Sequence, residues 1–323
     1  MSRSTILIVS DIHYAGAAER VRNGFQWRGL NSPLTRQLAR SYYHHIWLRD
    51  PFAHNHLVDR ALAHPEEPAL VIANGDFSCD TAHVGLSDDA AFQSAQECLG
   101  KLRTKFAGKL HCTIGDHELG KIWLFGGAGG PRLESWRRTT IDLGLQPFWQ
   151  VAWHDYILIG VCSTLIALPV FEPELLPAER AEWEQLRAVH LAEIRAAFAQ
   201  LRPDQRVLLF CHDPTALPFL GREGVVRERF PQIEHTIIGH LHTQLVFRQS
   251  RLLAGMPTIP FLGNAVRRMS MALREARCWR PFRVRLCPSL AGVELLKDGG
   301  YLTGTLDSES REPARFQFHP LAR

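Results

Sequence analysis

Five short apolar segments, each followed closely by aspartate or histidine, constrain the fold of this chain more than any other feature. Runs of this length, rich in β-branched and aliphatic residues, predict strands that are buried on both faces, as in a parallel sheet. In open α/β sheets, ligands bind at the carboxyl ends of the strands. The pattern therefore predicts an α/β protein with a polar site at the strand ends. The apolar segments are residues 5–9, 69–73, 110–114, 206–210 and 236–238.

The polar residues that follow these segments form a set suited to metal binding. Histidines two positions apart, as in the Gly-His-Leu-His sequence after the last segment, point to the same side of an extended chain. Carboxylates mixed with imidazoles suit a pair of transition-metal ions such as Mn, Fe, Co or Zn, and the set is too rich in histidine for Ca or Mg alone. No serine or cysteine stands in a Gly-x-Ser-x-Gly turn, which argues against a nucleophilic serine or cysteine. The candidate residues are Asp11, His13, Asp76, Asp116, His117, His212, His240 and His242.

Composition and charge narrow the class of protein. The chain has 323 residues, of which 46% are hydrophobic and 22% charged, as is typical of a soluble globular protein with a sizeable core. A net charge of +4 does not indicate a general nucleic-acid binder, so we expect no stable nucleic-acid complex. The seven cysteines form no C-x-x-C pair, which favours reduced thiols over disulfides or a zinc ribbon. The sequence has no signal-peptide pattern and no long apolar run, and therefore predicts a cytoplasmic protein.

We expect one domain with an insertion. Residues 1–308 are assigned to this domain, within which residues 14–60 form a helical insertion or cap. Residues 243–308 are expected to supply C-terminal strands that complete the sheet. Residues 309–323 are polar and are predicted to be a loosely held tail.

The insertion is rich in arginine and aromatic residues, and two interpretations remain open. In the first, it is a pair of helices that bury their aromatic side chains and leave the arginines in water. In the second, it leans over the site and holds phosphate or a base by charge and stacking. A second basic patch contains seven arginines from Arg267 to Arg285.

Several other polar residues are predicted to serve structure. His190 lies on the apolar face of a helix predicted over residues 177–201 and is expected in the core. His111 stands within an apolar run and is expected to be a strand or core histidine. His54 and His56 are expected at the surface. Asp80 is expected to cap a helix or to support the site indirectly, without a ligand role.

The order of these motifs resembles that of the calcineurin-like metallophosphoesterases, from Asp11 to His242. That family has D-x-H, G-D, G-N-H-[DE], H and G-H-x-H in this order, and the resemblance covers about three-quarters of the chain. It implies a four-layer α/β/β/α sandwich with two metal ions at the strand ends. By the same resemblance, the first metal would be held by Asp11, His13 and His242, and the second by His212 and His240. Asp76 would bridge the two ions, and His117 would lie just outside them, near the leaving group.

Two positions depart from the family pattern. Asp116 stands where the family usually has asparagine, and Cys79 stands where it has a second aspartate after the G-D motif. A carboxylate at position 116 would bind a divalent ion more tightly than an amide does, and it would lower the positive charge of the site by one unit. We therefore count Asp116 among the ligands and expect the site to attract phosphomonoester dianions less than usual.

The predicted function is that of a dinuclear-metal-dependent hydrolase of phosphoesters. The resemblance implies a metal-bridging hydroxide as nucleophile and His117 as general acid, with two divalent ions, of which Mn is favoured. The basic and aromatic segments favour a phosphodiester or pyrophosphate substrate with a large anionic or nucleotide part. Alternatives are a UDP-2,3-diacylglucosamine-type pyrophosphatase of lipid A synthesis, which would make peripheral contact with a membrane, a phosphoprotein phosphatase, or a cyclic-nucleotide phosphodiesterase. A catalytically silent metal-binding scaffold is the alternative of another class.

Overall fold

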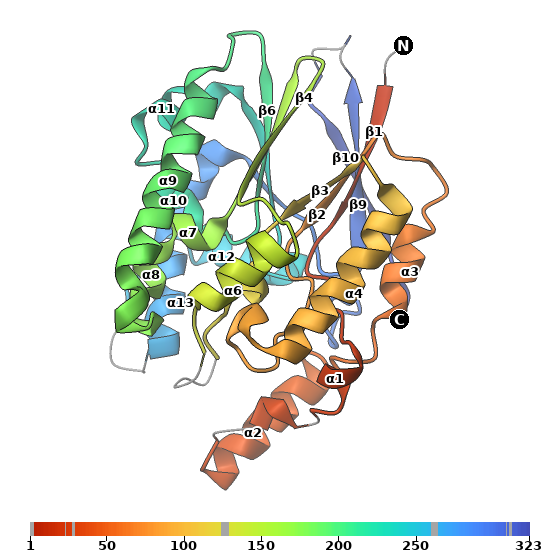
Figure 1. Ribbon diagram of the computed structural model, residues 1–323, viewed down its shortest axis with the longest axis vertical. Coiled ribbons are helices and arrows are strands. Elements are labelled where there is room, and N and C mark those ends of the chain that lie inside the picture. The colour runs from red at the N-terminus through yellow and green to blue at the C-terminus, as the bar shows by residue number, and fades with distance from the viewer. Residues whose placement is uncertain are drawn as a thin grey trace.

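Two five-stranded sheets lie between layers of helices in the computed structural model of this chain (Figure 1). The predicted α/β fold and the four-layer α/β/β/α sandwich that the resemblance implies are thereby confirmed. The structure describes residues 3–22, 24–27, 30–123, 129–259, 264–307, 309 and 312–323.

The first sheet is formed by β1 (Arg3–Val9), β2 (Leu70–Asn74), β3 (Leu110–Thr113), β9 (Gly300–Asp307) and β10 (Arg315–Pro320). The strand order is β10-β9-β1-β2-β3. β1, β2 and β3 run parallel, whereas β9 is antiparallel to both of its neighbours. The three parallel strands therefore bring their carboxyl ends to the same edge of this sheet.

The second sheet is formed by β4 (Phe148–Trp153), β5 (Tyr156–Val161), β6 (Arg206–Cys211), β7 (Ile233–Ile238) and β8 (Val284–Leu286), in that order. β4 and β5 form an antiparallel hairpin, and β5 to β8 are parallel. The carboxyl ends of β6 and β7 thus lie side by side. All five strand segments predicted from the apolar runs are confirmed.

Three apolar clusters separate the layers. Between the sheets, Ile6 and Ile8 of β1 pack with residues of the second sheet such as Leu158 and Phe210. The alternate residues of β1, Leu7 and Val9, belong to the cluster beneath the helices of the first sheet. Because successive side chains of a strand point to opposite faces, a strand that is covered on both sides must be apolar throughout. This is the physical reason for the unbroken apolar runs in the sequence.

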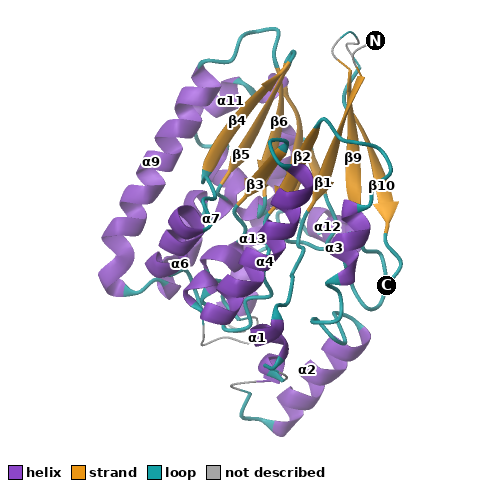
Figure 2. Cartoon of the chain, turned by 45° about the vertical axis from the view of Figure 1, so that its right-hand side comes forward, coloured by secondary structure: helices purple, strands orange, loops and turns teal. Residues whose placement is uncertain are grey.

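Helices cover the outer faces of both sheets (Figures 1 and 2). α4 (Asp89–Phe106) and α3 (His56–Leu62) contribute to the core of the first sheet, and α9 (Arg180–Ala199) contributes to that of the second. His190 on α9 is 2% exposed, and its Nε2 accepts a hydrogen bond from the backbone N–H of Cys162, which confirms it as a core histidine. The other helices are α1 (Ala17–Arg20), α2 (Pro33–His45), α5 (Asp116–Leu119), α6 (Leu133–Arg137), α7 (Ser163–Ile166), α8 (Leu168–Phe171), α10 (Leu217–Leu220), α11 (Gly224–Glu228), α12 (Gln244–Leu252) and α13 (Asn264–Glu275). Among the helices that the structure describes, none is both long enough and apolar enough to cross a bilayer.

The segment of residues 14–60 contains α1, α2 and the start of α3, and α2 projects beyond the rest of the chain (Figure 2). The start of this segment is held by polar contacts with the rest of the chain. The fully buried carboxylate of Glu19 on α1 accepts hydrogen bonds from the backbone N–H groups of Cys79 and Thr81, just after β2. The side chain of Asn55 bonds both backbone groups of Ala15. The loop that follows β2 is therefore fixed against the start of this segment.

Two predictions for the C-terminal part are corrected by the structure. The tail is not loosely held at residues 315–320, because these form β10, which pairs along its length with β9. Phe316 on β10 also packs against the cluster between the sheets. Residues 243–308 supply β8 and β9, which extend different sheets, but most of residues 244–282 are helical.

Candidate metal centre

The residues predicted for the site are brought together at the carboxyl ends of five parallel strands, three from the first sheet and two from the second. β1 is followed by Asp11 and His13, β2 by Asp76, β3 by Asp116 and His117, β6 by His212, and β7 by His240 and His242. The carboxylates and imidazoles converge there in sets of three, each set with its ligand atoms within 4.8 Å of one another. These sets are Asp11, His13 and His242; Asp116, His212 and His240; Asp11, Asp76 and His212; and His13, Asp76 and His117.

The backbone at the site is held in a conformation that most residues avoid. Asp11, His13, Asp76, His240 and His242 all have φ between 49° and 60°. A left-handed conformation costs a residue other than glycine about 1–3 kcal/mol, and it persists only where the surroundings enforce it. Such strain gathers at functional sites, where it turns side chains out of the strand direction.

Glycine is required where two strand ends approach each other. Gly239 lies so close to Ser10 and Asp11 that a Cβ at this position would collide with both side chains. Gly75 has a φ of +89°, and a Cβ there would lie 2.8 Å from Nδ1 of His212. These glycines allow the ends of strands from different sheets to meet at the site.

The first group of candidate ligands consists of Asp11, His13 and His242. The carboxylate of Asp11 is fully buried and accepts hydrogen bonds from Ser10 Oγ at 2.6 Å and from the backbone N–H of His240 at 2.9 and 3.1 Å. Nε2 of His242 lies 3.3 Å from Oδ1 of Asp11 and 3.4 Å from Nε2 of His13. The three ligand atoms thus face a common point.

The second group consists of Asp116, His212 and His240. Nδ1 of His212 donates a hydrogen bond to the backbone carbonyl of Asn74 at 2.5 Å, which turns Nε2 toward the carboxylates. Nε2 of His212 and Nδ1 of His240 lie 3.2 and 3.0 Å from the same oxygen, Oδ1 of Asp116. A backbone acceptor on the far ring nitrogen is the usual way in which proteins orient a metal-binding histidine.

Asp76 lies between the two groups. Its Oδ1 accepts a hydrogen bond from the backbone N–H of His117 at 3.0 Å. Its Oδ2 lies 3.1 Å from Nε2 of His212, yet neither of these two buried atoms makes a hydrogen bond of acceptable geometry. Buried polar atoms without a partner are rare and require an explanation. A metal ion bound by both atoms would satisfy them.

The pKa values of the histidines indicate that the buried carboxylates require positive charge beside them. Burial opposes charge on the rings, but the carboxylates of Asp76 and Asp11 raise the pKa of His212 well above its ordinary value. In the same way, Asp213 and Asp116 raise the pKa of His240 to about 10 against the effect of burial. Burial lowers the pKa of His13 to about 4, so its ring is neutral. Protons on His212 and His240 therefore compensate the carboxylates in the metal-free protein.

These observations fit divalent metal ions at the site. The donors are carboxylate oxygens and imidazole nitrogens, the mixed set that Mn, Fe, Co and Zn accept. The side chains of Asp11, Asp76 and Asp116 are at most 6% exposed, so water supplies little of the charge compensation that their carboxylates need. The described residues could bind divalent metal.

A lysine not anticipated from the sequence completes the site beside His117. Nδ1 of His117 lies 3.0 Å from the backbone carbonyl of Ser78 and donates to it, so Nε2 is left as an acceptor. The ammonium of Lys121 lies in hydrogen-bonding contact with that Nε2. Burial lowers the pKa of His117 well below its ordinary value, and the charge of Lys121 adds to this effect. Lys121 therefore donates a hydrogen bond to His117.

Glu118 was also not assigned a role from the sequence, whereas Trp47 belongs to the arginine-rich and aromatic segment for which the sequence leaves two interpretations open. The fully buried Glu118 accepts hydrogen bonds from the backbone N–H groups of Asp76, Phe77 and Gly115, at 2.9, 2.7 and 2.8 Å. Its position directly after His117 matches the acidic residue of the motif and could have indicated this role. Trp47 lies with its ring centroid 4.8 Å from that of His242, so the segment of residues 14–60 reaches the site.

The remaining predictions for individual residues agree with the structure in part. Asp80 accepts hydrogen bonds from the backbone N–H groups of Val84 and Gly85 and holds a turn. His56 is exposed, whereas His54 is only partly exposed. All seven cysteines are free, as predicted.

Comparison with known proteins gives only weak likenesses. No family model matches the chain, and no curated protein matches its sequence. Among solved structures, a dimetal phosphatase from Danio rerio is 13% identical, with a TM-score of 0.48 over 98% of this chain and 95% of that chain. A phosphopantetheinyl hydrolase from Mycobacterium tuberculosis is 15% identical, with a TM-score of 0.36 over 74% of this chain and 83% of that chain. At these identities and scores, the likeness does not by itself identify a function for this chain.

Proposed function

We propose that this chain is a dinuclear-metal-dependent phosphoester hydrolase that acts on phosphodiesters or pyrophosphates. One observation carries the proposal: three buried carboxylates and four imidazoles converge from the ends of strands in both sheets. Asp11, His13 and His242 would hold one ion. Asp116, His212 and His240 would hold the other, and Asp76 would contact both.

Two divalent ions, when bound, would supply Lewis acidity for activating water and for neutralising the charge of a phosphoryl group, and we propose Mn. The chain itself supplies the proton for the leaving group. Lys121 Nζ donates a hydrogen bond to His117 Nε2, and we propose that this pair delivers a proton to the departing oxygen. The backbone carbonyl of Ser78, which accepts from Nδ1, keeps Nε2 of His117 directed into the site.

The surroundings of the site favour a substrate with a large second group. Trp47 packs against His242, and Tyr42 stacks on Trp47 with ring centroids 6.3 Å apart and planes at 15°. Aromatic rings beside a phosphoryl-binding centre can stack a base. A phosphodiester or a pyrophosphate with a nucleotide part would use this feature.

The proposal is tested with purified, Mn-loaded protein on a chromogenic phosphodiester and its monoester, side by side. We expect turnover of the diester, and we expect His212→Ala, which removes a proposed metal ligand, to remove most of it. The surface variant His56→Ala controls for the loss of a histidine away from the site. If Mn-loaded protein with a full metal complement hydrolyses neither these esters nor nucleotide pyrophosphates, the catalytically silent scaffold replaces the hydrolase.

A further inference from the structure

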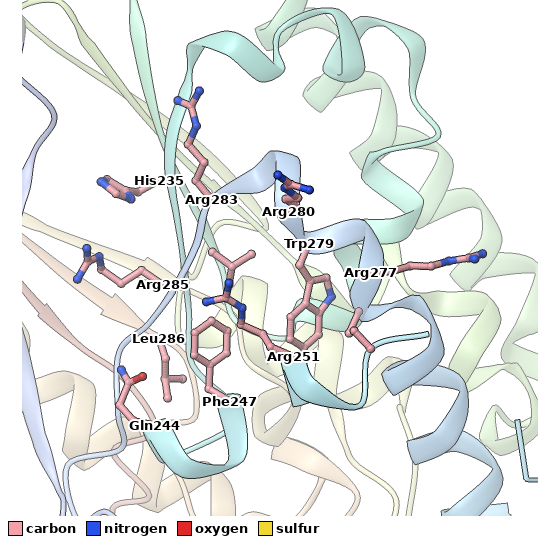
Figure 3. Close-up of a pocket in the computed structure, with 13 residues that line it drawn as sticks. His235, Gln244, Phe247, Arg251, Arg277, Trp279, Arg280, Arg283, Arg285 and Leu286 are labelled. Carbon is pink, nitrogen blue, oxygen red and sulfur yellow. The ribbon is translucent and has the colours of Figure 1, made fainter. Parts of the chain in front are cut away.

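A second pocket, separate from the metal centre, has an unusual concentration of arginine (Figure 3). Its volume is about 550 Å³, which is within the range of small-molecule sites. The pocket lies between α12, β8 and the 3-10 segment Ala276–Phe282, and its described lining residues include no aspartate or glutamate. We call it the arginine pocket. Its charged lining residues are Arg251, Arg277, Arg280, Arg283 and Arg285, with His235 beside them.

These arginines lack the carboxylate partners that would explain their gathering. Among the described residues, no ion pair involves Arg251, Arg280 or Arg285, and Nε of Arg285 is buried without a hydrogen bond. The nearby carboxylate of Glu275 pairs instead with Arg222, at 3.9 Å. Mutual repulsion of guanidinium groups is unfavourable unless an anion compensates it.

Aromatic rings lie beside two of these guanidinium groups. The guanidinium of Arg251 lies 5.8 Å from the ring centroid of Phe247, and that of Arg285 lies 5.1 Å from that of Phe316. Phe247 is stacked with Trp279, with ring centroids 6.3 Å apart. Figure 3 shows Arg251, Phe247 and Trp279 at the centre of the pocket, whereas Arg277 extends away from it.

An unpaired buried donor gives an independent indication of a ligand. Trp279 is 6% exposed, and its Nε1–H has no hydrogen-bond partner among the described residues. Indole N–H groups usually find a partner when they are buried. An anion in the arginine pocket would accept from this group as well as from the arginines.

We propose that the arginine pocket binds a compact anion with two or more phosphate groups. Five arginines and no described carboxylate line this one concave space, so the lining carries more positive charge than a single phosphate dianion can neutralise. A volume of about 550 Å³ suits a small polyanion rather than the extended backbone of a nucleic acid. Arginine is the side chain best suited to phosphate, because its planar fork can donate two hydrogen bonds to one phosphate group.

The arginine pocket is distinct from the metal centre. None of its lining residues belongs to the ligand sets at the strand ends. α12 begins two residues after His242 and contributes Gln244, Phe247 and Arg251 to the pocket. The proposal therefore does not depend on the hydrolase function.

The test uses metal-free full-length protein and inorganic pyrophosphate, titrated by calorimetry at fixed ionic strength. We expect saturable binding with one site per chain, and weaker binding of orthophosphate. Arg251→Gln and Arg285→Gln should each lower the affinity by about 10-fold or more, because a charge-assisted hydrogen bond contributes about 1.5–3 kcal/mol. Trp279→Phe should lower it to a smaller extent.

Two controls make the outcome decisive. Arg274→Gln removes the same charge from an exposed position on α13 that does not line the pocket, and it should leave the affinity unchanged. His240→Ala should also leave it unchanged, because it alters only the metal centre. Arg251 is exposed, so its variant should fold normally. The proposal is overturned if pyrophosphate does not saturate, if Arg274→Gln has the same effect as Arg251→Gln, or if only His240→Ala weakens binding.

Discussion

Nδ1 of His240 lies 3.0 Å from Oδ1 of Asp116, and the same oxygen lies 3.2 Å from Nε2 of His212. Position 116 thus carries a carboxylate, whereas the family that this sequence resembles usually has an amide there. In the metal-free protein, this arrangement favours protonated rings on both histidines. In the metal-bound protein, it would add one negative charge to the ligand set.

The first prediction concerns the variant Asp116→Asn. Loss of one negative charge should weaken metal binding, by at least the roughly 10-fold that changes around a metal ligand typically cost. The more positive centre should also attract dianions better, so the ratio of monoester to diester turnover should rise. Both are measured by metal competition and by kcat/KM at saturating metal. An unchanged turnover ratio would contradict the role given to this charge.

Metal affinity should rise with pH, because His240 must lose a proton before it can bind a metal ion. Its pKa, which partial burial lowers but Asp213 and Asp116 raise to about 10, keeps the ring protonated at neutral pH in the metal-free protein. A metal ion that uses this ring must displace the proton. The apparent affinity should therefore rise between pH 6 and pH 8, by about tenfold per pH unit for each proton displaced. Competition with a chromophoric chelator measures this, and a flat profile would exclude His240 as a ligand.

The role of Lys121 is tested with Lys121→Met. If the ammonium supplies the leaving-group proton through His117, turnover of esters with poor alkoxide leaving groups should fall by about 100-fold. Turnover of a nitrophenyl ester should change little, because nitrophenolate leaves without protonation. Lys101→Met is a matched control, since Lys101 pairs with Asp59 on the surface. Equal losses for both kinds of ester would point instead to a role in binding.

Trp47 is expected to act on binding of the substrate's second group. Trp47→Ala should raise KM for a nucleotide-containing diester by about 10-fold, since base stacking contributes about 1–3 kcal/mol. KM for a small diester without a base serves as the internal control and should change little. A similar rise in both KM values would mean that Trp47 only supports His242.

The sheets and the predicted site residues could be anticipated because their signals are local. An apolar run such as Val71–Ala73 is required wherever a strand is covered on both faces, and the polar residue after it must lie at the strand end. The contact of Lys121 with His117 could not be anticipated, because it depends on the path of the chain just after α5. The sequence left open whether the segment that contains Trp47 reaches the site, because the contact of Trp47 with His242 joins residues far apart in the chain. β10 could not be predicted either. Its polar residues are also typical of an exposed tail, and only the pairing with β9 makes this segment a strand. The left-handed conformations of Asp11 and His240 are indicated only weakly by residue type, although aspartate and histidine adopt this conformation more often than most residues.

The last prediction concerns the contact between strand ends at Gly239. A Cβ at this position would collide with Ser10 Oγ and with the Asp11 carboxylate, so Gly239→Ala should displace Asp11 from the metal centre. We expect metal affinity to fall by about 10–100-fold, the range found when groups that position a ligand are changed. The matched control is Gly224→Ala, because Gly224 begins α11 and nothing lies within 4 Å of its added Cβ. Chelator competition measures the affinity, and thermal unfolding of the metal-free variants separates a local displacement from general destabilisation. If both alanine variants bind metal equally well, the backbone at Gly239 can shift to accommodate a Cβ. The close approach of Gly239 to Asp11 would then not be what positions the Asp11 carboxylate.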